Sequence, residues 1–139
     1  MRVAVLLALT VLLPLVSVAV ARVSVPESAL LPLVGRWFVF WAAGLRLFLD
    51  GAGQLFRRRA AGFRPEAAVA ALAIGATGLM AVHRTHWTPA AAMAGGIFLG
   101  GLALVRLAQG GRSRAATAGA AGDLFAAAML GVYLASRAV

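Results

Sequence analysis

Long uninterrupted runs of apolar residues constrain this chain more than any other feature of its sequence. Five such runs lie near residues 2–21, 35–57, 66–83, 88–108 and 115–136. About 20 residues, at about 1.5 Å each, cross a hydrocarbon core of roughly 30 Å as one α-helix. Because that core holds no water, a spanning backbone must bond to itself. We predict an all-α fold over residues 1–139, a single domain forming an integral membrane helical bundle with four core transmembrane helices plus an N-terminal helix.

Composition and charge exclude a water-soluble domain, a nucleic-acid-binding protein and sites that need cysteine. Hydrophobic residues make up 63% of the 139 positions, which is too many for a soluble domain of this size to bury. The net charge of +9 comes from arginines at the ends of the apolar runs, where they anchor and orient helices. We therefore expect the lipid bilayer as partner and no nucleic acid. The absence of Cys excludes disulfides, thiolate metal ligation and thiol catalysis.

The first apolar run has two interpretations. It follows Arg2 and ends in Ala19-Val20-Ala21, a small-x-small pattern that a signal peptidase could cut. The run is long for a signal peptide, and multispan proteins seldom need a cleaved one, so we favour a retained helix. Pro14 is expected to distort it, because proline removes a backbone donor and crowds the preceding turn.

The remaining boundaries are marked by prolines, caps and aromatic residues. Residues 22–32 read as a short exposed link, with 29–34 in the outer interface. Pro65 and Glu66 suit the first turn of a helix, as does Thr88-Pro89. Trp37 and Trp41 lie where interfacial aromatics gather.

The distribution of arginines predicts the orientation. One end of the bundle would receive Arg2, Arg57, Arg58, Arg59, Arg64, Arg106, Arg112 and Arg114, and the other Arg22, Arg36, Arg84 and Arg137. By the positive-inside rule the first end is cytoplasmic. We expect a multi-pass protein of the bacterial cytoplasmic (inner) membrane, with the N-terminus inside and the C-terminus outside.

Three polar residues on the second run form the main candidate site. Arg46, Asp50 and Gln54 are spaced four apart, so they project from one stripe of a helix. Arg46 falls near the middle of the span, where a charge needs a partner. Asp50 is the nearest, and Asp123 on the fifth run lies at a matching depth. If these helices touch, the four side chains form a net negative polar cluster, either a proton, ion or ligand site or a structural ion pair.

Glycines indicate close helix packing. Gly96 and Gly100 are four apart, as are Ala118 and Gly122, and Ala71 and Gly75. Small residues at this spacing let membrane helices approach closely. The pattern fits an internal bundle and a homo-oligomer equally.

No catalytic, metal or cofactor site is predicted. His83 and His86 have no third ligand nearby and fit a loop at the membrane surface better than a metal site. The chain has no nucleophile turn, no HExxH and no phosphate loop, so we expect a protein that is not an enzyme.

Several motifs resemble a known family. They are Arg36-Trp37-Phe38-Val39-Phe40-Trp41, Gly44-Leu45-Arg46-Leu47, Gly53-Gln54-Leu55-Phe56, Leu72-Ala73-Ile74-Gly75, Gly95-Gly96-Ile97-Phe98 and Asp123-Leu124-Phe125. Over residues 36–130 the chain resembles an uncharacterised (domain-of-unknown-function) family of small bacterial multispan membrane proteins, loosely DoxX-like in layout. The resemblance implies four core helices and a leading helix but no activity. Glu66, followed mostly by alanine, departs from members with more polar residues there.

Three functions remain open. We favour a non-catalytic helical module that packs with itself as a homo-oligomer or with partner proteins in a larger membrane complex. The alternative is a small transporter or proton carrier that uses the Arg46, Asp50 and Asp123 cluster. A third is an accessory subunit of a membrane redox complex.

Overall fold

The computed structural model is an all-α bundle, and it describes residues 2–27, 29–56, 65–109 and 114–138. The first helix runs through α1 (Arg2–Leu7), the π-helical segment η1 (Ala8–Leu12) and α2 (Leu13–Ser24), and the second through α3 (Leu30–Phe38), the π-helical η2 (Val39–Arg46) and α4 (Leu47–Phe56). The others are α5 (Pro65–Met80), the short 3₁₀ turn η3 (Thr85–Trp87), α6 (Thr88–Ala108) and α7 (Arg114–Ala138). The arginines at positions 57–59, 64 and 112 lie outside the described residues.

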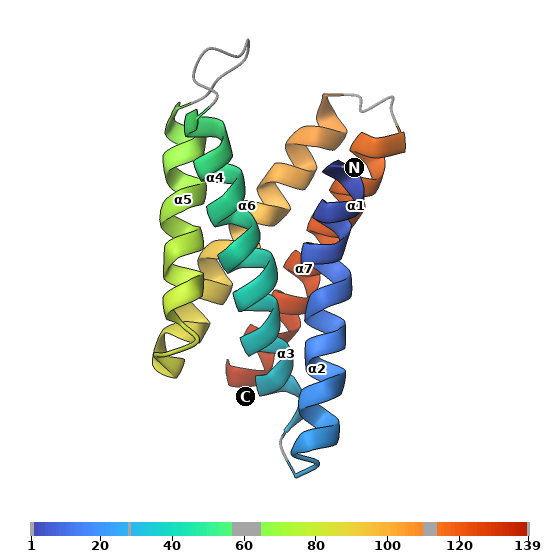
Figure 1. Cartoon of the computed structure of the whole chain (residues 1–139), viewed down its shortest axis with the longest axis vertical. Coiled ribbons are helices and arrows are strands. Elements are labelled where there is room, and N and C mark those ends of the chain that lie inside the picture. The colour runs from blue at the N-terminus through green and yellow to red at the C-terminus, as the bar shows by residue number, and fades with distance from the viewer. Residues whose placement is uncertain (1, 28, 57–64, 110–113, 139) are drawn as a thin grey trace.

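The helices run between two ends of one elongated bundle (Figure 1). The start of α1, the end of α4, the start of α5 and the end of α6 lie at one end, and the C-terminus lies at the other with the α2–α3 and α5–α6 connections. The α5 helix runs beside α4, and α7 lies against both α6 and α1. The N-terminal helix is therefore packed into the bundle.

Four helices are long and apolar enough to cross a membrane: Ala4–Ser24, Leu30–Phe56, Thr85–Ala108 and Arg114–Ala138. The predicted helix over 66–83 is shorter in the structure, because α5 ends at Met80 and the backbone then turns, with the His83 N–H donating to the Met80 carbonyl. Its 16 residues measure about 24 Å, less than a hydrocarbon core of roughly 30 Å.

Two other boundaries differ from the sequence-based prediction. The second helix begins at Leu30, not near 35, so the segment assigned to the interface is already helical. Pro32 is tolerated there because the first turn of a helix has no internal acceptor for its N–H groups. The first helix continues to Ser24, past the predicted end at 21.

π-helical segments interrupt the first two helices. Ala8–Leu12 lies just before Pro14, whose ring crowds the carbonyl four residues earlier, that of Thr10. We attribute this segment to that proline. Val39–Arg46 has no proline within it, and it ends at Arg46, the central charge of the candidate site. Such segments are frequent at functional sites.

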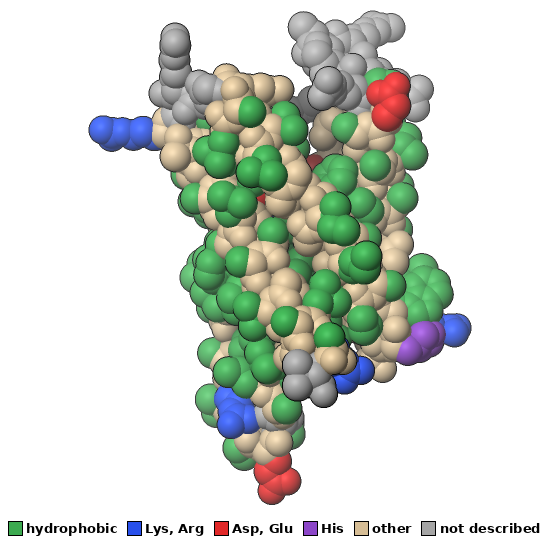
Figure 2. Space-filling model, turned by 180° about the vertical axis from the view of Figure 1, so that it is seen from behind, with side chains coloured by type: hydrophobic (Ala, Val, Ile, Leu, Met, Phe, Trp, Pro, Cys, Tyr) green, Lys and Arg blue, Asp and Glu red, His purple; other side chains and the backbone are tan. Residues whose placement is uncertain are grey.

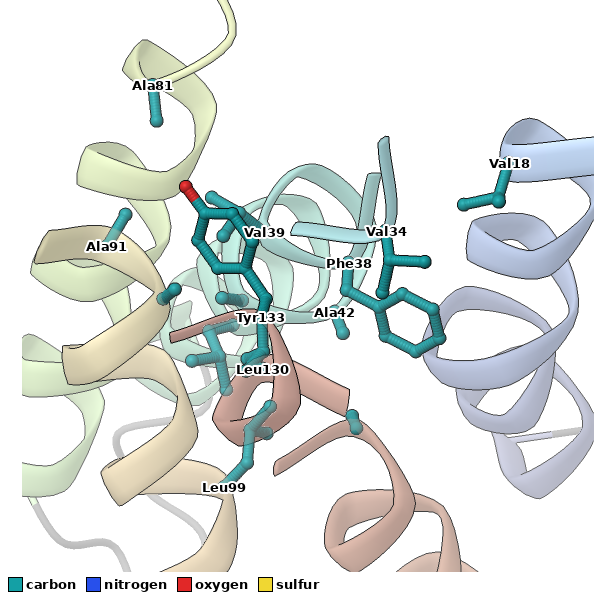
Figure 3. Packing of buried hydrophobic residues seen from close by; sticks show 14 of the residues in the cluster. Val18, Val34, Phe38, Val39, Ala42, Ala81, Ala91, Leu99, Leu130 and Tyr133 are labelled. Atoms are coloured by element: carbon teal, nitrogen blue, oxygen red, sulfur yellow. The ribbon is translucent and has the colours of Figure 1, made fainter. Parts of the chain in front are cut away.

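The hydrophobic core lies where α3, η2, α6 and α7 meet. Figure 3 shows Val34 and Phe38 facing Val18 of α2, with Leu130 and Tyr133 approaching from α7. Phe38 also packs against Phe125 of α7, with ring centroids 5.9 Å apart. A hydrogen bond from Trp41 Nε1 to Ser17 Oγ, 2.9 Å long, joins the first two helices. The core thus ties the N-terminal helix to the rest.

The outer surface between the two ends is apolar. In Figure 2 the charged side chains gather toward the ends, and hydrophobic side chains and backbone cover the region between them. Exposed apolar residues occur on the membrane-length helices, among them Leu12, Val20, Ile97, Leu104 and Val132. This distribution is what a helix bundle solvated by lipid requires.

Candidate functional site

Asp123 is the centre of a buried ion-pair network. Its side chain is 0% exposed, although it lies in the middle of α7. The carboxylate atom Oδ1 pairs with Nη1 of Arg46, and Oδ2 accepts a hydrogen bond from Nη1 of Arg106. The guanidinium groups come from two different helices, η2 and α6. One aspartate therefore connects three helices.

Arg46 is almost as deeply buried, at 2% exposure. Next to Arg46 the backbone of η2 lies close to α5, because Gly44 of η2 contacts Gly78 of α5 where the two helices cross. A Cβ at Gly78 would lie 2.7 Å from the Gly44 Cα, so neither helix could carry a larger residue there without moving. This close approach fixes the position of η2 and hence of Arg46.

Asp50 is the second acid of the network but lies at its edge. Its Oδ2 is 3.7 Å from Nε of Arg46, one helical turn earlier. The Asp50 side chain is 46% exposed, so its attraction to Arg46 is screened more than that of Asp123. The principal partner of Arg46 is thus Asp123 on another helix.

Arg106 was predicted only as a charged residue at the end of its helix. In the structure its side chain reaches back to Asp123 and is 29% exposed. Gly119 lies one turn before Asp123 on α7, and a Cβ there would be 3.6 Å from Arg106 Nη1. This is an ordinary contact distance, so the arginine packs beside the start of α7 without requiring glycine there. With Arg106 included, two arginines face two aspartates, so the cluster is balanced and not net negative as expected.

The Arg46 guanidinium is held mainly by charge. Its Nε, Nη1 and Nη2 atoms are buried, yet none forms a hydrogen bond of normal geometry with a described residue. The pairing with Asp123 brings opposite charges together without the two parallel hydrogen bonds of a bidentate pair. Loss of the Asp123 charge would therefore leave Arg46 with few compensating contacts.

Gln54 does not join this network. Its side chain is exposed, and it makes no hydrogen bond to another described residue. It lies one turn beyond Asp50, whose side chain is already half exposed, so this face of the helix is no longer buried at Gln54. The structure brings together Arg46, Asp50 and Asp123 and leaves the fourth predicted member outside.

The predicted packing glycines fall into two groups. Gly75 lies directly against Phe48, where an added Cβ would be 2.3 Å from the backbone nitrogen, and Gly122 faces Leu7 at 3.2 Å. At Gly96 and Gly100 an added Cβ would meet α7 at 3.6 and 3.7 Å, an ordinary contact. Only glycine fits at Gly75, because its neighbours are backbone atoms. At Gly122 the neighbour is the end of a leucine side chain that can shift, and alanine would fit at Gly96 and Gly100.

The two histidines are exposed, and His86 stacks edge to face on Trp87. Within the described ranges, no three His, Asp or Glu side chains are grouped as metal ligands would be. The network of Arg46, Asp50, Asp123 and Arg106 is thus the main buried concentration of charge. Comparisons with family models, with curated proteins and with solved structures found no match to this chain.

Proposed function

We propose that this chain is a non-catalytic integral membrane module whose buried ion-pair network holds its helices in one arrangement, and that its outer surface packs with copies of itself or with a larger membrane complex. The observation that carries the proposal is the position of Asp123, fully buried between arginines of two other helices. A balanced set of charges shared by three helices suits a structural role.

The environment and orientation belong to the same proposal. Four membrane-length helices support a multi-pass location, and the excess of arginine at the N-terminal end supports an N-terminus inside and a C-terminus outside a bacterial cytoplasmic membrane. The packing of Gly122 against Leu7, and of Trp41 against Ser17, supports retention of the first helix.

Exposed small residues on α7 support packing between copies. Ala121, Ala128, Gly131 and Ala135 are exposed and follow one another at spacings of seven, three and four. No other atom lies within 4 Å of the position that a Cβ would take at Gly131. Leu124, 40% exposed, lies on the same face between Ala121 and Ala128, so the part from Ala128 to Ala135 is where a second helix could approach closely.

Cysteine cross-linking tests this packing, because the chain has no cysteine of its own. An Ala128→Cys variant should form a disulfide-linked dimer in membranes upon mild oxidation. A Val69→Cys variant, exposed on α5, serves as the matched control and should stay monomeric. Equal cross-linking at both positions, or none at Ala128 together with no co-purifying membrane protein, contradicts the proposal.

A small proton or ion carrier is the second candidate, and one observation favours it. Asp50 and Arg106 are partly exposed, at 46% and 29%, so the network is not sealed from its surroundings. Intramembrane ionisable groups commonly mark ion pathways. An accessory redox subunit stays a third prediction, which co-purification with such a complex would support.

Proteoliposomes separate the two main candidates. We expect wild-type protein to give no more proton flux than empty liposomes, because each oxygen of Asp123 is held by an arginine. A flux that Asp123→Asn abolishes in a folded protein would establish the carrier instead. Asp50→Asn is the control for the half-exposed acid, and flux dependent on both acids would define the pathway.

A further inference from the structure

A cavity opens at the end of the bundle opposite the N-terminus, away from the ion-pair network. It measures about 630 Å³ and lies between the start of α3, the η3–α6 turn and the end of α7. These helix ends would lie at headgroup depth if the helices span a bilayer. Its polar lining residues are Arg36, Thr85, His86, Thr88, Tyr133 and Arg137.

The cavity has a cationic lining. Arg36 and Arg137 reach it from two different helices, and no acidic residue is among the residues that line it. Neither arginine forms an ion pair with a carboxylate in the described part of the chain, and Arg36 rests 5.8 Å from the ring centre of Trp37. Two arginines without acidic partners around one cavity favour an anion.

The hydroxyl groups of two residues that are otherwise buried add polarity to the wall. Thr88 is 5% exposed and Tyr133 is 4% exposed. Neither side chain is hydrogen-bonded to another residue in the described ranges. The Tyr133 ring lies on Gly35, where a Cβ would come within 2.3 Å of it, and Figure 3 shows its oxygen pointing away from Leu130 and Leu99. Both oxygens keep accessible surface, as groups that face the cavity do, so they are free to hydrogen-bond to a ligand or to water there.

A second, apolar cavity adjoins the first. It measures about 530 Å³ and is lined by Leu30 and Leu31, and it shares Ala29, Pro32 and Arg137 with the cationic cavity. Leu30 and Leu31 are 52% and 38% exposed. Both leucines belong to the first turn of α3, roughly 8–9 Å nearer the end of the bundle than Arg36, so this apolar surface forms the outer rim of the site.

We propose that this double cavity is a binding site for an anionic phospholipid. Its phosphate would lie between Arg36 and Arg137 and accept hydrogen bonds from the hydroxyls of Thr88 and Tyr133. The site is separate from the ion-pair network, so lipid binding here does not depend on the function proposed above.

Lipid retention by the purified full-length chain tests this site. Native mass spectrometry and thermal shift are measured with phosphatidylglycerol, with phosphatidylcholine and with inorganic phosphate. We expect phosphatidylglycerol to be retained most strongly and to raise the melting temperature, with little effect of the other two. Loss of each arginine should weaken its apparent affinity about fivefold, the value of one basic residue at an anionic surface.

The decisive variants are Arg36→Gln with Arg137→Gln, and Arg84→Gln as control. Arg84 is exposed at the same end of the bundle but does not line either cavity. The double variant should keep the lipid-free melting temperature of wild type and lose the preference for phosphatidylglycerol, whereas the control should keep that preference. Equal losses in both variants, or equal retention of both lipids by wild type, overturns the site. Inorganic phosphate that protects as well as the lipid overturns a phospholipid as the occupant.

Discussion

Replacing Asp123 with leucine is expected to destabilise the bundle by about 3–5 kcal/mol, the usual cost of stranding a buried charge. The substitution leaves the Arg46 guanidinium at 2% exposure with only Asp50 near it, 3.7 Å from Nε. Unfolding in mixed detergent micelles, followed by the fluorescence of the three tryptophans, measures the change.

The geometry also predicts an order among the variants. Arg46→Leu should cost less than Asp123→Leu, because Asp123 keeps its hydrogen bond from Arg106. Asp50→Leu is the matched control on the partly exposed acid, and it should cost about 1 kcal/mol or less. If Asp50→Leu lowered the free energy of unfolding as much as Asp123→Leu, Asp123 would not be the centre of the network.

Replacing Gly75 with alanine is expected to destabilise the fold by about 1–3 kcal/mol through overpacking. The added Cβ would lie 2.3 Å from the Phe48 nitrogen and 2.6 Å from its Cα, and backbone atoms cannot move aside as a flexible side chain can. Helices α4 and α5 would have to separate. A thermal-shift series in detergent measures the loss.

Two other glycines provide controls for this effect. At Gly96 an added Cβ would meet Leu130 Cβ at 3.6 Å, and at Gly53 nothing lies within 4 Å. Gly96→Ala and Gly53→Ala should therefore be neutral or slightly stabilising, since alanine favours helix over glycine. A loss at Gly53 equal to that at Gly75 would mean that backbone flexibility, not close packing, is what these glycines supply.

The sequence was sufficient for the all-α fold, and it predicted the meeting of Arg46 with Asp123 on the condition that their helices touch. The fold follows from apolar runs of membrane length, and the meeting follows from depth, because two charged residues at similar depths in a hydrocarbon layer need each other. The same reasoning wrongly included Gln54 in the cluster. Helical spacing shows which residues share one face of a helix, but it does not show which residues on that face are buried.

Other features could not be read from the sequence. Arg106 lies in the last turn of α6, the usual place for an anchoring arginine, and its inward reach to Asp123 depends on how α6 and α7 lie against each other. The π-helical segment before Arg46 has no proline to signal it. Among many glycines, the crossing of Gly44 with Gly78 became evident only from the relative position of the helices.

A double-mutant cycle between Arg46 and Asp123 is the most direct test of the ion-pair network. The free energy of unfolding is measured for wild type, Arg46→Leu, Asp123→Leu and the double variant. We predict that the double variant recovers much of the stability lost in Asp123→Leu, because two apolar side chains leave no stranded charge between them. Additive losses, with the double variant the least stable of the four, would show that these residues do not hold the helices together through each other.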